Sequence, residues 1–319
     1  MKKVKLGQLV SIQTGKLDAN AAVFGGKYPF FTTAKEISRI NEYAYDGEVV
    51  LVAGNGDLNV KYYKGKFNAY QRTYILTSNS NVRMKYLYYF LDKYIEVLRY
   101  QSIGGVIKYI KLNNLSDAQI PMRSIFEQDK IIGILEKLDN EIIIRSKQLS
   151  ELSNLVKSRF NEMFGDVILN DKEWKVCKWN EILTIRNGKN QKNVEDNNGQ
   201  FPIYGSGGII GYAKDWIVKK NSVIIGRKGN INKPILVREN FWNVDTAFGL
   251  EPTLEKINSE YLFYFCQLYN FEKLNKAVTI PSLTKSDLLD ISIPLPPLSL
   301  QNEFADFVAQ VTNHNLLVR

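Results

Sequence analysis

The chain has 319 residues, of which 45% are hydrophobic and 24% are charged, and this composition is typical of a soluble globular protein with room for two domains. Its two cysteines, Cys177 and Cys266, are too few and too far apart for a disulfide framework. No uncharged apolar run approaches the roughly 18 residues of a membrane span, and no apolar segment follows the Met-Lys-Lys start, so we expect a cytoplasmic protein that does not enter the membrane.

The formal net charge of +9 is unevenly distributed along the chain. Residues 1–123 carry 18 Lys and Arg against 9 Asp and Glu, whereas residues 166–296 carry 17 against 15. The segments 124–165 and 297–319 each have a net charge of −1. A basic first domain of this kind suggests a polyanionic partner.

The sequence repeats itself after about 173 residues, and the matching segments keep their order. Residues 4–15 (VKLGQLVSIQTG) resemble residues 177–188 (CKWNEILTIRNG), and matches between short strands, Gly- and Asn-rich turns and a closing Ile-Pro pair follow. Each copy consists of short β-branched segments and turns, with helices predicted at residues 82–100 and 259–274. We therefore expect an α+β protein with two tandem mixed α/β domains.

Long coiled-coil helices are expected to separate these domains. The first helix should begin with a capping box formed by Ser124 and Glu127 and end at Gly165, and its apolar residues fall on alternating steps of four and three. A length of about 40 residues, or roughly 60 Å, exceeds that of an average helix and favours a spacer over an ordinary core helix. The predicted order is a domain at 1–123, a helix at 124–165, a domain at 166–297 and a short helix at 298–319.

The second helix should begin near Ser299, and its apolar seam consists of Leu300, Phe304, Phe307, Val311, His314 and Val318. We expect residues 299–319 to pack antiparallel on part of the first helix. The other part would then expose an apolar stripe of the kind that marks a protein interface. Its members would be Leu149, Leu152, Val156, Phe160 and Met163.

A family resemblance rests on four features of the sequence. They are the ordered repeat, the stretch at residues 204–212 (YGSGGIIGY), the Gly-Arg-Lys-Gly run at 226–229, and the closing pattern at 293–298 (IPLPPL) followed by Gln301. The first-half junction, from Ile120-Pro121 to Glu127-Gln128, is also similar. Together these features resemble the DNA-specificity subunit of type I restriction-modification systems over essentially the whole chain.

The resemblance implies two target-recognition domains joined by spacer helices, each reading one half of a split, asymmetric site in double-stranded DNA. It also implies that methyltransferase subunits are held by the helices and that a restriction subunit, a nuclease and translocase, joins them. A rigid spacer of a few tens of ångströms would place the half-sites on the order of ten base pairs apart.

The sequence departs from the family in two places. The terminal helix is about half as long as the first, which leaves open whether the subunit is truncated, whether it still binds two methyltransferase subunits, and whether it dimerises through its helices. The first domain has Thr32-Thr33-Ala34-Lys35 where the second has Gly-Ser-Gly-Gly. This difference would fit two different half-sites, or drift in a structural loop.

The candidate DNA-binding residues lie mostly on turns at matching places in the two halves. Polar side chains can reach base edges there, while Lys and Arg bind phosphates. The candidates are Thr32, Thr33, Lys35, Asn55, Arg72, Lys108 and Tyr109 in the first half, and Ser206, Gly207, Arg227, Lys228, Asn230, Ser282 and Lys285 in the second. The alternative is that these are ordinary turns and, for Arg72, a solvated strand charge. The aromatic residues at 86–90 and 261–265 are expected in the core.

Enzymatic functions find little support in the sequence. It contains no phosphate-binding loop and no Asn/Asp-Pro-Pro-aromatic tetrapeptide of amino-methyltransferases. A single histidine, His314, excludes a His-rich metal site, and its place in the helix seam favours a packed over a catalytic histidine. We expect a non-catalytic subunit without cofactor or metal. Two alternatives remain: a coiled-coil adaptor between proteins that does not bind DNA, and an enzyme, such as a nuclease, whose motif is not evident.

Overall fold

The computed structural model describes residues 2–317, and the side chains of residues 2–312. It divides into two compact units, Met1–Ile143 and Ile144–Arg319, and each unit holds one copy of the sequence repeat. The side chains of His314 and Val318, two members of the predicted terminal seam, lie outside the described residues. Within residues 2–317, no helix is both long enough and apolar enough to cross a membrane.

The first unit is built on a six-stranded sheet. Its strands lie in the order β2 (Val10–Thr14), β7 (Thr73–Ser78), β5 (Tyr45–Ala53), β6 (Val60–Ala69), β3 (Tyr28–Phe31) and β4 (Ser38–Ile40). All neighbours are antiparallel except β3 and β6, which are parallel. Helix α1 (Met84–Gln101) packs Leu87 and Leu91 into one core with Val50 and Val52 of the central strand β5.

The second unit repeats this strand order but divides it between two sheets. One sheet has the order β10 (Leu183–Asn187), β16 (Ala247–Pro252), β13 (Ser222–Gly226), β14 (Ile235–Val237), and the other β12 (Gly208–Ala213), β11 (Phe201–Gly205), β15 (Trp242–Asn243). The place of the long strand β6 is taken by two short strands, β14 and β15, so the sheet is interrupted between them. The predicted α+β class and the tandem repeat are confirmed.

Shorter elements close each unit in the same way. The first unit has β1 (Lys3–Lys5), η1 (Leu6–Gln8), η2 (Ala19–Ala21), α2 (Leu112–Ser116) and β8 (Gln119–Pro121). The second has β9 (Val176–Lys178), α4 (Trp179–Ile182), α5 (Ser259–Leu268), η3 (Phe271–Leu274), α6 (Lys285–Leu289) and β17 (Ser292–Pro294). The helix predicted at 259–274 is thus shorter than expected, because Tyr269 turns to extended backbone and the Asn270 side chain caps a separate 3₁₀ turn.

A proline-to-helix junction holds each long helix to its own unit by the same hydrogen bonds. Gln128 is fully buried, accepts the Arg83 N–H at 2.9 Å and donates to the Arg123 carbonyl at 2.9 Å. Gln301, also fully buried, accepts the Asn258 N–H and donates to the Pro296 carbonyl, both at 2.8 Å.

Two buried tyrosines complete these junctions. The Tyr86 hydroxyl donates to the Pro121 carbonyl at 2.6 Å, and the Tyr261 hydroxyl donates to the Pro294 carbonyl at the same distance. Burial raises the pKa of both phenols, so both hydroxyls remain protonated donors at neutral pH. Of the aromatic residues predicted in the core, Tyr86, Tyr261 and Phe265 are buried. The others are half-buried, namely Tyr88, Tyr89, Phe90, Phe263 and Tyr264.

Helix α3 (Ile125–Phe164) has the predicted start and end. The Ser124 hydroxyl accepts the Glu127 N–H at 3.3 Å, and the Glu127 carboxylate accepts the Ser124 N–H at 3.0 Å, which is the predicted capping box. Gly165 ends the helix with a φ of +74°, a left-handed conformation that favours glycine.

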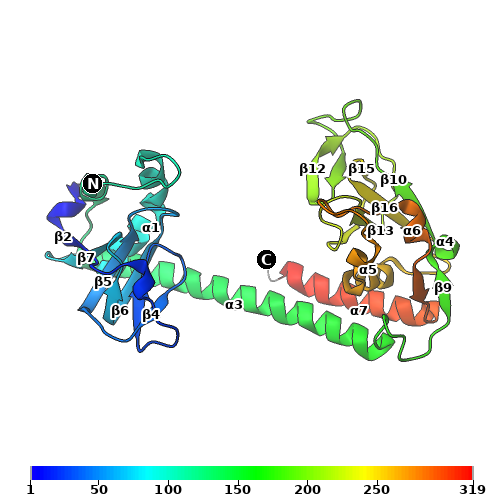
Figure 1. The fold of residues 1–319 in the computed structure, drawn as a ribbon, viewed down its shortest axis with the longest axis horizontal. Helices are drawn as coiled ribbons and strands as arrows, with labels where there is room; N and C mark the ends of the chain where they lie inside the picture. The colour runs from blue at the N-terminus through cyan, green and yellow to red at the C-terminus, as the bar shows by residue number, and fades with distance from the viewer. Residues whose placement is uncertain (1, 318–319) are drawn as a thin grey trace. The chain divides into compact units, whose positions relative to one another are not determined.

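In the second unit, helix α7 (Leu298–Leu317) packs antiparallel on the last turns of α3, as predicted (Figure 1). The Phe304 ring lies 5.2 Å from that of Phe160 and 5.5 Å from that of Phe164, centroid to centroid. An ion pair of 3.1 Å joins Arg159 to Glu303 beside them.

The prediction that this part of α3 is uncovered is therefore wrong. Val156, Phe160 and Met163 are buried, and Leu152 is half-buried, while Leu149 remains 41% exposed. The physical reason is that α5 and α7 both pack there: the ring of Tyr261 stacks on Phe160 at 5.6 Å from one side and Phe304 meets it from another. Exposed apolar residues lie earlier in the helix, where Ile134, Leu138 and Ile142 of the first unit are each more than half exposed.

Candidate nucleic-acid interface

In the first unit, two loops that carry predicted DNA-binding residues are joined by backbone hydrogen bonds. The Gly56 N–H donates to the Lys108 carbonyl and the Ile110 N–H donates to the Gly54 carbonyl, each at 2.9 Å. The Gly54 N–H donates to the Arg72 carbonyl at 2.8 Å. Asn55, Arg72, Lys108 and Tyr109 therefore lie together on one tip of the domain.

The second unit contains the same arrangement. The Gly229 N–H donates to the Pro281 carbonyl at 3.0 Å, and the Leu283 N–H donates to the Arg227 carbonyl at 2.9 Å. The Arg227 N–H donates to the Thr246 carbonyl at 2.8 Å. Arg227, Lys228 and Ser282 are thus brought together as their first-half equivalents are, and we call each such assembly a loop tip.

A close backbone approach explains one glycine of the second loop tip. A Cβ atom on Gly226 would lie 2.3 Å from the Asn230 carbonyl oxygen, so no larger residue fits without moving the turn. The turn can then hold Arg227, Lys228 and Asn230 on its outer side, where all three are exposed.

A third predicted segment joins each loop tip. In the first unit, the Asn59 amide donates to the Thr33 carbonyl at 2.8 Å, and Lys35 forms a 3.5 Å ion pair with Asp57. In the second unit, the Asn230 amide nitrogen lies 3.5 Å from the position that a Cβ on Gly207 would take. The Thr32-Thr33-Ala34-Lys35 and Ser206-Gly207 segments therefore border equivalent turns.

Lys285 lies apart from the other candidates. It is the first residue of α6 and lines a separate cavity of about 340 Å³ with Arg186, Asn187 and Lys189. Its sequence position next to the 279–283 loop suggested a place on the loop tip, but Thr284 caps α6 by accepting the Asp287 N–H, and the chain turns there.

The cations of the loop tips are available to a ligand. Arg72, Lys108, Arg227 and Lys228 are exposed, and within the described part of the chain none of them forms an ion pair. Arg227 extends over the Phe248 ring, with its guanidinium 5.8 Å from the ring centre. Cations without carboxylate partners can bind phosphates without first breaking an ion pair.

Apolar residues that the sequence did not single out stand on the same loops. Val106 and Ile107 in the first unit and Val278 and Ile280 in the second are exposed, with Val106 and Val278 fully so. Ile107 and Ile280 occupy matching places, three residues before Ile110 and Leu283, and each valine stands one or two residues before its isoleucine. The Gly104-Gly105 and Pro281 turn signals next to them were the available clue. Apolar side chains beside cations can contact thymine methyl groups or enter a base step.

The described residues contain no group of three or more His, Cys, Asp or Glu side chains arranged to hold a metal ion. The loop tips instead combine backbone amides, hydroxyls, cations and apolar side chains. Such a surface can bind a polyanion and discriminate between hydrogen-bonding edges.

Residues 1–154 and 171–318 both match the family model for the type I restriction modification DNA specificity domain. The chain is 38% identical over 177 residues to the type I restriction enzyme EcoDI specificity subunit of Escherichia coli, a match that covers 54% of this chain and 39% of that subunit. It is 23% identical over 366 residues to the MjaVIII specificity subunit of Methanocaldococcus jannaschii, covering 97% of this chain and 85% of that one.

Among solved structures, the fold resembles that of the type I restriction-modification S subunit from M. genitalium. The TM-score is 0.72 at 19% identity, and the match covers 99% of this chain and 90% of that chain. At this sequence identity, the match shows that the two proteins share a fold.

Proposed function

Because the chain belongs to the family of type I restriction-modification DNA specificity domains, we propose that its two loop tips read the two halves of a split DNA site. It is the sequence-recognition subunit of such a system and is not itself catalytic. The observation that carries the proposal is the repeated loop tip, in which the same three backbone hydrogen bonds hold unpaired cations in both units.

The two halves of the site should differ in sequence. By the matching hydrogen bonds, Asn55 of the first loop tip corresponds to Lys228 of the second, Tyr109 to Ser282 and Gly54 to Arg227. Arginine recognises guanine and asparagine recognises adenine through paired hydrogen bonds, so different side chains on one scaffold select different bases. An asymmetric site in double-stranded DNA follows from this difference.

Methyltransferase subunits and a restriction subunit are the proposed protein partners. Support comes from the exposed apolar residues of α3 in the first unit, where Ile134, Leu138 and Ile142 recur every four residues and so share one helix face. The same face could instead pair two copies of this chain. Sedimentation of the chain alone and with the methyltransferase subunit distinguishes a homodimer from a mixed complex.

The experiment that tests the proposal is methylation of a randomised duplex library. The chain is mixed with its cognate methyltransferase subunit, and each component alone serves as the control. We expect methylation only with both components, at a two-part motif with an unread gap. Methylation of the same motif by the methyltransferase subunit alone would contradict the proposal.

Binding of the isolated chain to duplex DNA in increasing salt tests the adaptor alternative. A chain that neutralises several phosphates loses affinity steeply, with log K falling by about 0.9 per phosphate contact for each unit of log salt. An adaptor for proteins alone would show no salt-dependent binding to DNA at all.

A further inference from the structure

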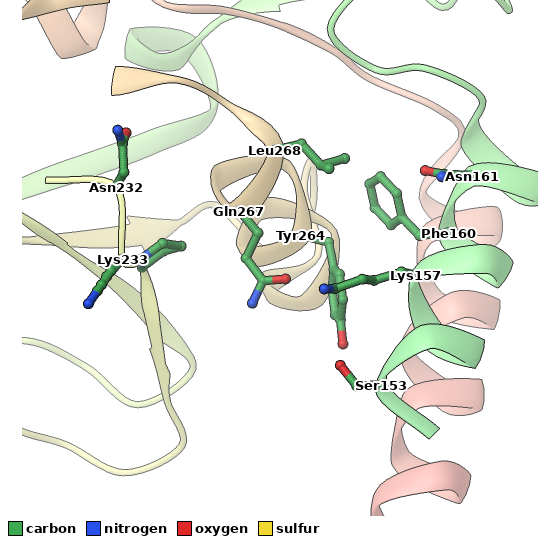
Figure 2. A pocket seen from close by; sticks show the side chains of 10 residues that line it. Ser153, Lys157, Phe160, Asn161, Asn232, Lys233, Tyr264, Gln267 and Leu268 are labelled. Atoms are coloured by element: carbon green, nitrogen blue, oxygen red, sulfur yellow. The ribbon is translucent and has the colours of Figure 1, made fainter. Parts of the chain in front are cut away.

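A cavity of about 550 Å³ lies in the second unit between α3, α5 and the turn that joins β13 to β14 (Figure 2). Ser153, Lys157 and Phe160 line it from α3, and Tyr264, Gln267 and Leu268 line it from α5. Lys233 stands on the opposite wall, on the turn. This volume lies within the range of about 300–1,000 Å³ common for binding pockets.

The charge of this cavity is positive and unbalanced. Lys157 and Lys233 are its only charged lining residues, and neither has an ion pair with any residue that the structure describes. Residues 153, 154, 160 and 161, which are the helical neighbours of Lys157, are Ser, Asn, Phe and Asn, so no carboxylate lies within a turn of it. The cavity should therefore attract an anionic group.

Lys157 faces two polar side chains of α5 across the cavity. Its side chain reaches across the opening toward Tyr264 and Gln267 (Figure 2). Burial raises the pKa of Tyr264 to about 12, so its hydroxyl remains a donor at neutral pH. An ammonium group, a phenol and a side-chain amide can together bind both oxygens of a carboxylate.

Part of the cavity wall and its rim is apolar, which argues against a bare phosphate as the ligand. The Phe160 and Tyr264 rings stack with their centroids 5.7 Å apart and form the back wall. Leu268 is 48% exposed at the rim, and Leu149, one turn before Ser153 on α3, is 41% exposed. A DNA backbone gains nothing from these leucines, whereas apolar side chains of a protein do.

We propose that this cavity binds an acidic segment of a partner protein, with a carboxylate on Lys157 and flanking apolar side chains against Leu268 and Leu149. The partner identity rests on the proposed function, which makes it the methyltransferase subunit. The cavity contributes specificity for that subunit through paired charge and apolar contact.

The test measures association of the full chain with the purified methyltransferase subunit by titration calorimetry. The variant carries Lys157→Glu and Lys233→Glu, and the matched control is Lys175→Glu, another exposed lysine of the same unit that lies outside the cavity. Lys157→Met keeps the apolar stem and separates charge from packing. Binding of the same variants to duplex DNA is measured by fluorescence anisotropy.

We expect the double charge reversal, Lys157→Glu with Lys233→Glu, to weaken association with the methyltransferase subunit at least tenfold. Lys157→Met should weaken this association less, and Lys175→Glu should change it less than twofold. DNA binding should change no more than in the control. If the Lys157→Glu, Lys233→Glu variant associates with the methyltransferase subunit as strongly as the control does, the inference is wrong and the proposed function stands. A variant that loses only DNA binding has the same two consequences. If the unaltered chain binds neither DNA nor the subunit, the proposed function fails and this inference fails with it.

Discussion

Gln128 and Gln301 occupy matching positions, and each fully buried side chain pairs with one backbone donor and one backbone acceptor. Replacing Gln301 by Leu leaves the Asn258 N–H and the Pro296 carbonyl unpaired, which should lower the free energy of unfolding by about 1–3 kcal/mol. Urea unfolding measures the loss. The control is Gln200→Leu at an exposed position of the same unit, which should change the free energy of unfolding by less than about 0.5 kcal/mol.

Arg227 and Lys228 are neighbours on one turn, yet their substitutions should differ in kind. Arg227→Ala should relax base preference in one half-site at a cost of about 1–3 kcal/mol, whereas Lys228→Ala should weaken binding to all sequences and reduce the salt slope by about 1. Methylation of a randomised library reports the first effect, and binding in a salt series reports the second. Identical effects of both variants would contradict the separate roles.

The capping box of α3 makes a small part of the stability depend on pH. The hydrogen bond from the Ser124 N–H, with that from its hydroxyl, holds the pKa of Glu127 below its ordinary value. A lowered pKa in the folded state means that this contribution is present above the unfolded pKa, near 4.3, and is lost as pH falls through the folded value. The melting temperature of Glu127→Gln should therefore be lower than that of the unaltered chain at about pH 6, and the two values should converge as the pH falls to about 3.

At the scale of loops and helices, the exposed apolar residues of the loop tips are the unexpected feature. Val278 and Ile280 are exposed, so Val278→Ser with Ile280→Ser should leave the melting temperature nearly unchanged. We expect the pair to weaken DNA binding severalfold, because apolar contacts in the groove are lost. The same double change at Val23 and Ile37, exposed residues outside the loop tips, is the control and should have no such effect.

The ends of α3 were predictable because their signals are local. A Ser and a Glu three residues apart satisfy each other's backbone donors, and Gly165 can adopt the positive φ that stops the helix. The loop tips were also partly predictable, since the repeat places Gly-rich turns at equivalent positions.

The burial of Phe160 was not predictable from its place in the apolar stripe of the first long helix. Periodicity tells which face of a helix is apolar but not which element covers it, and here α5 and α7 both do. The place of Lys285 depends on the same kind of long-range packing. So does the meeting of residues 54–57 with residues 102–110, which only the folded chain shows.

At the scale of the whole molecule, two units with separate loop tips predict modular recognition. Exchanging residues 166–296 for the equivalent domain of a relative should change one half of the methylated motif and leave the other half unchanged. The donor should keep aromatic residues at the positions of Tyr261 and Tyr264, because both rings pack on Phe160 of the resident helix. A motif altered in both halves would rule out independent reading.

Helix α3 contributes to two hydrophobic cores, since Ile132 is buried in the first unit and Phe160 and Phe164 are buried in the second. A genetic crossover at the end of the helix joins a new second domain to the Phe160 and Phe164 side chains of the original helix. A crossover near the boundary between residues 143 and 144 passes on the domain and its supporting helix end as one block. Recombinant genes with the second kind of junction should therefore yield folded proteins more often.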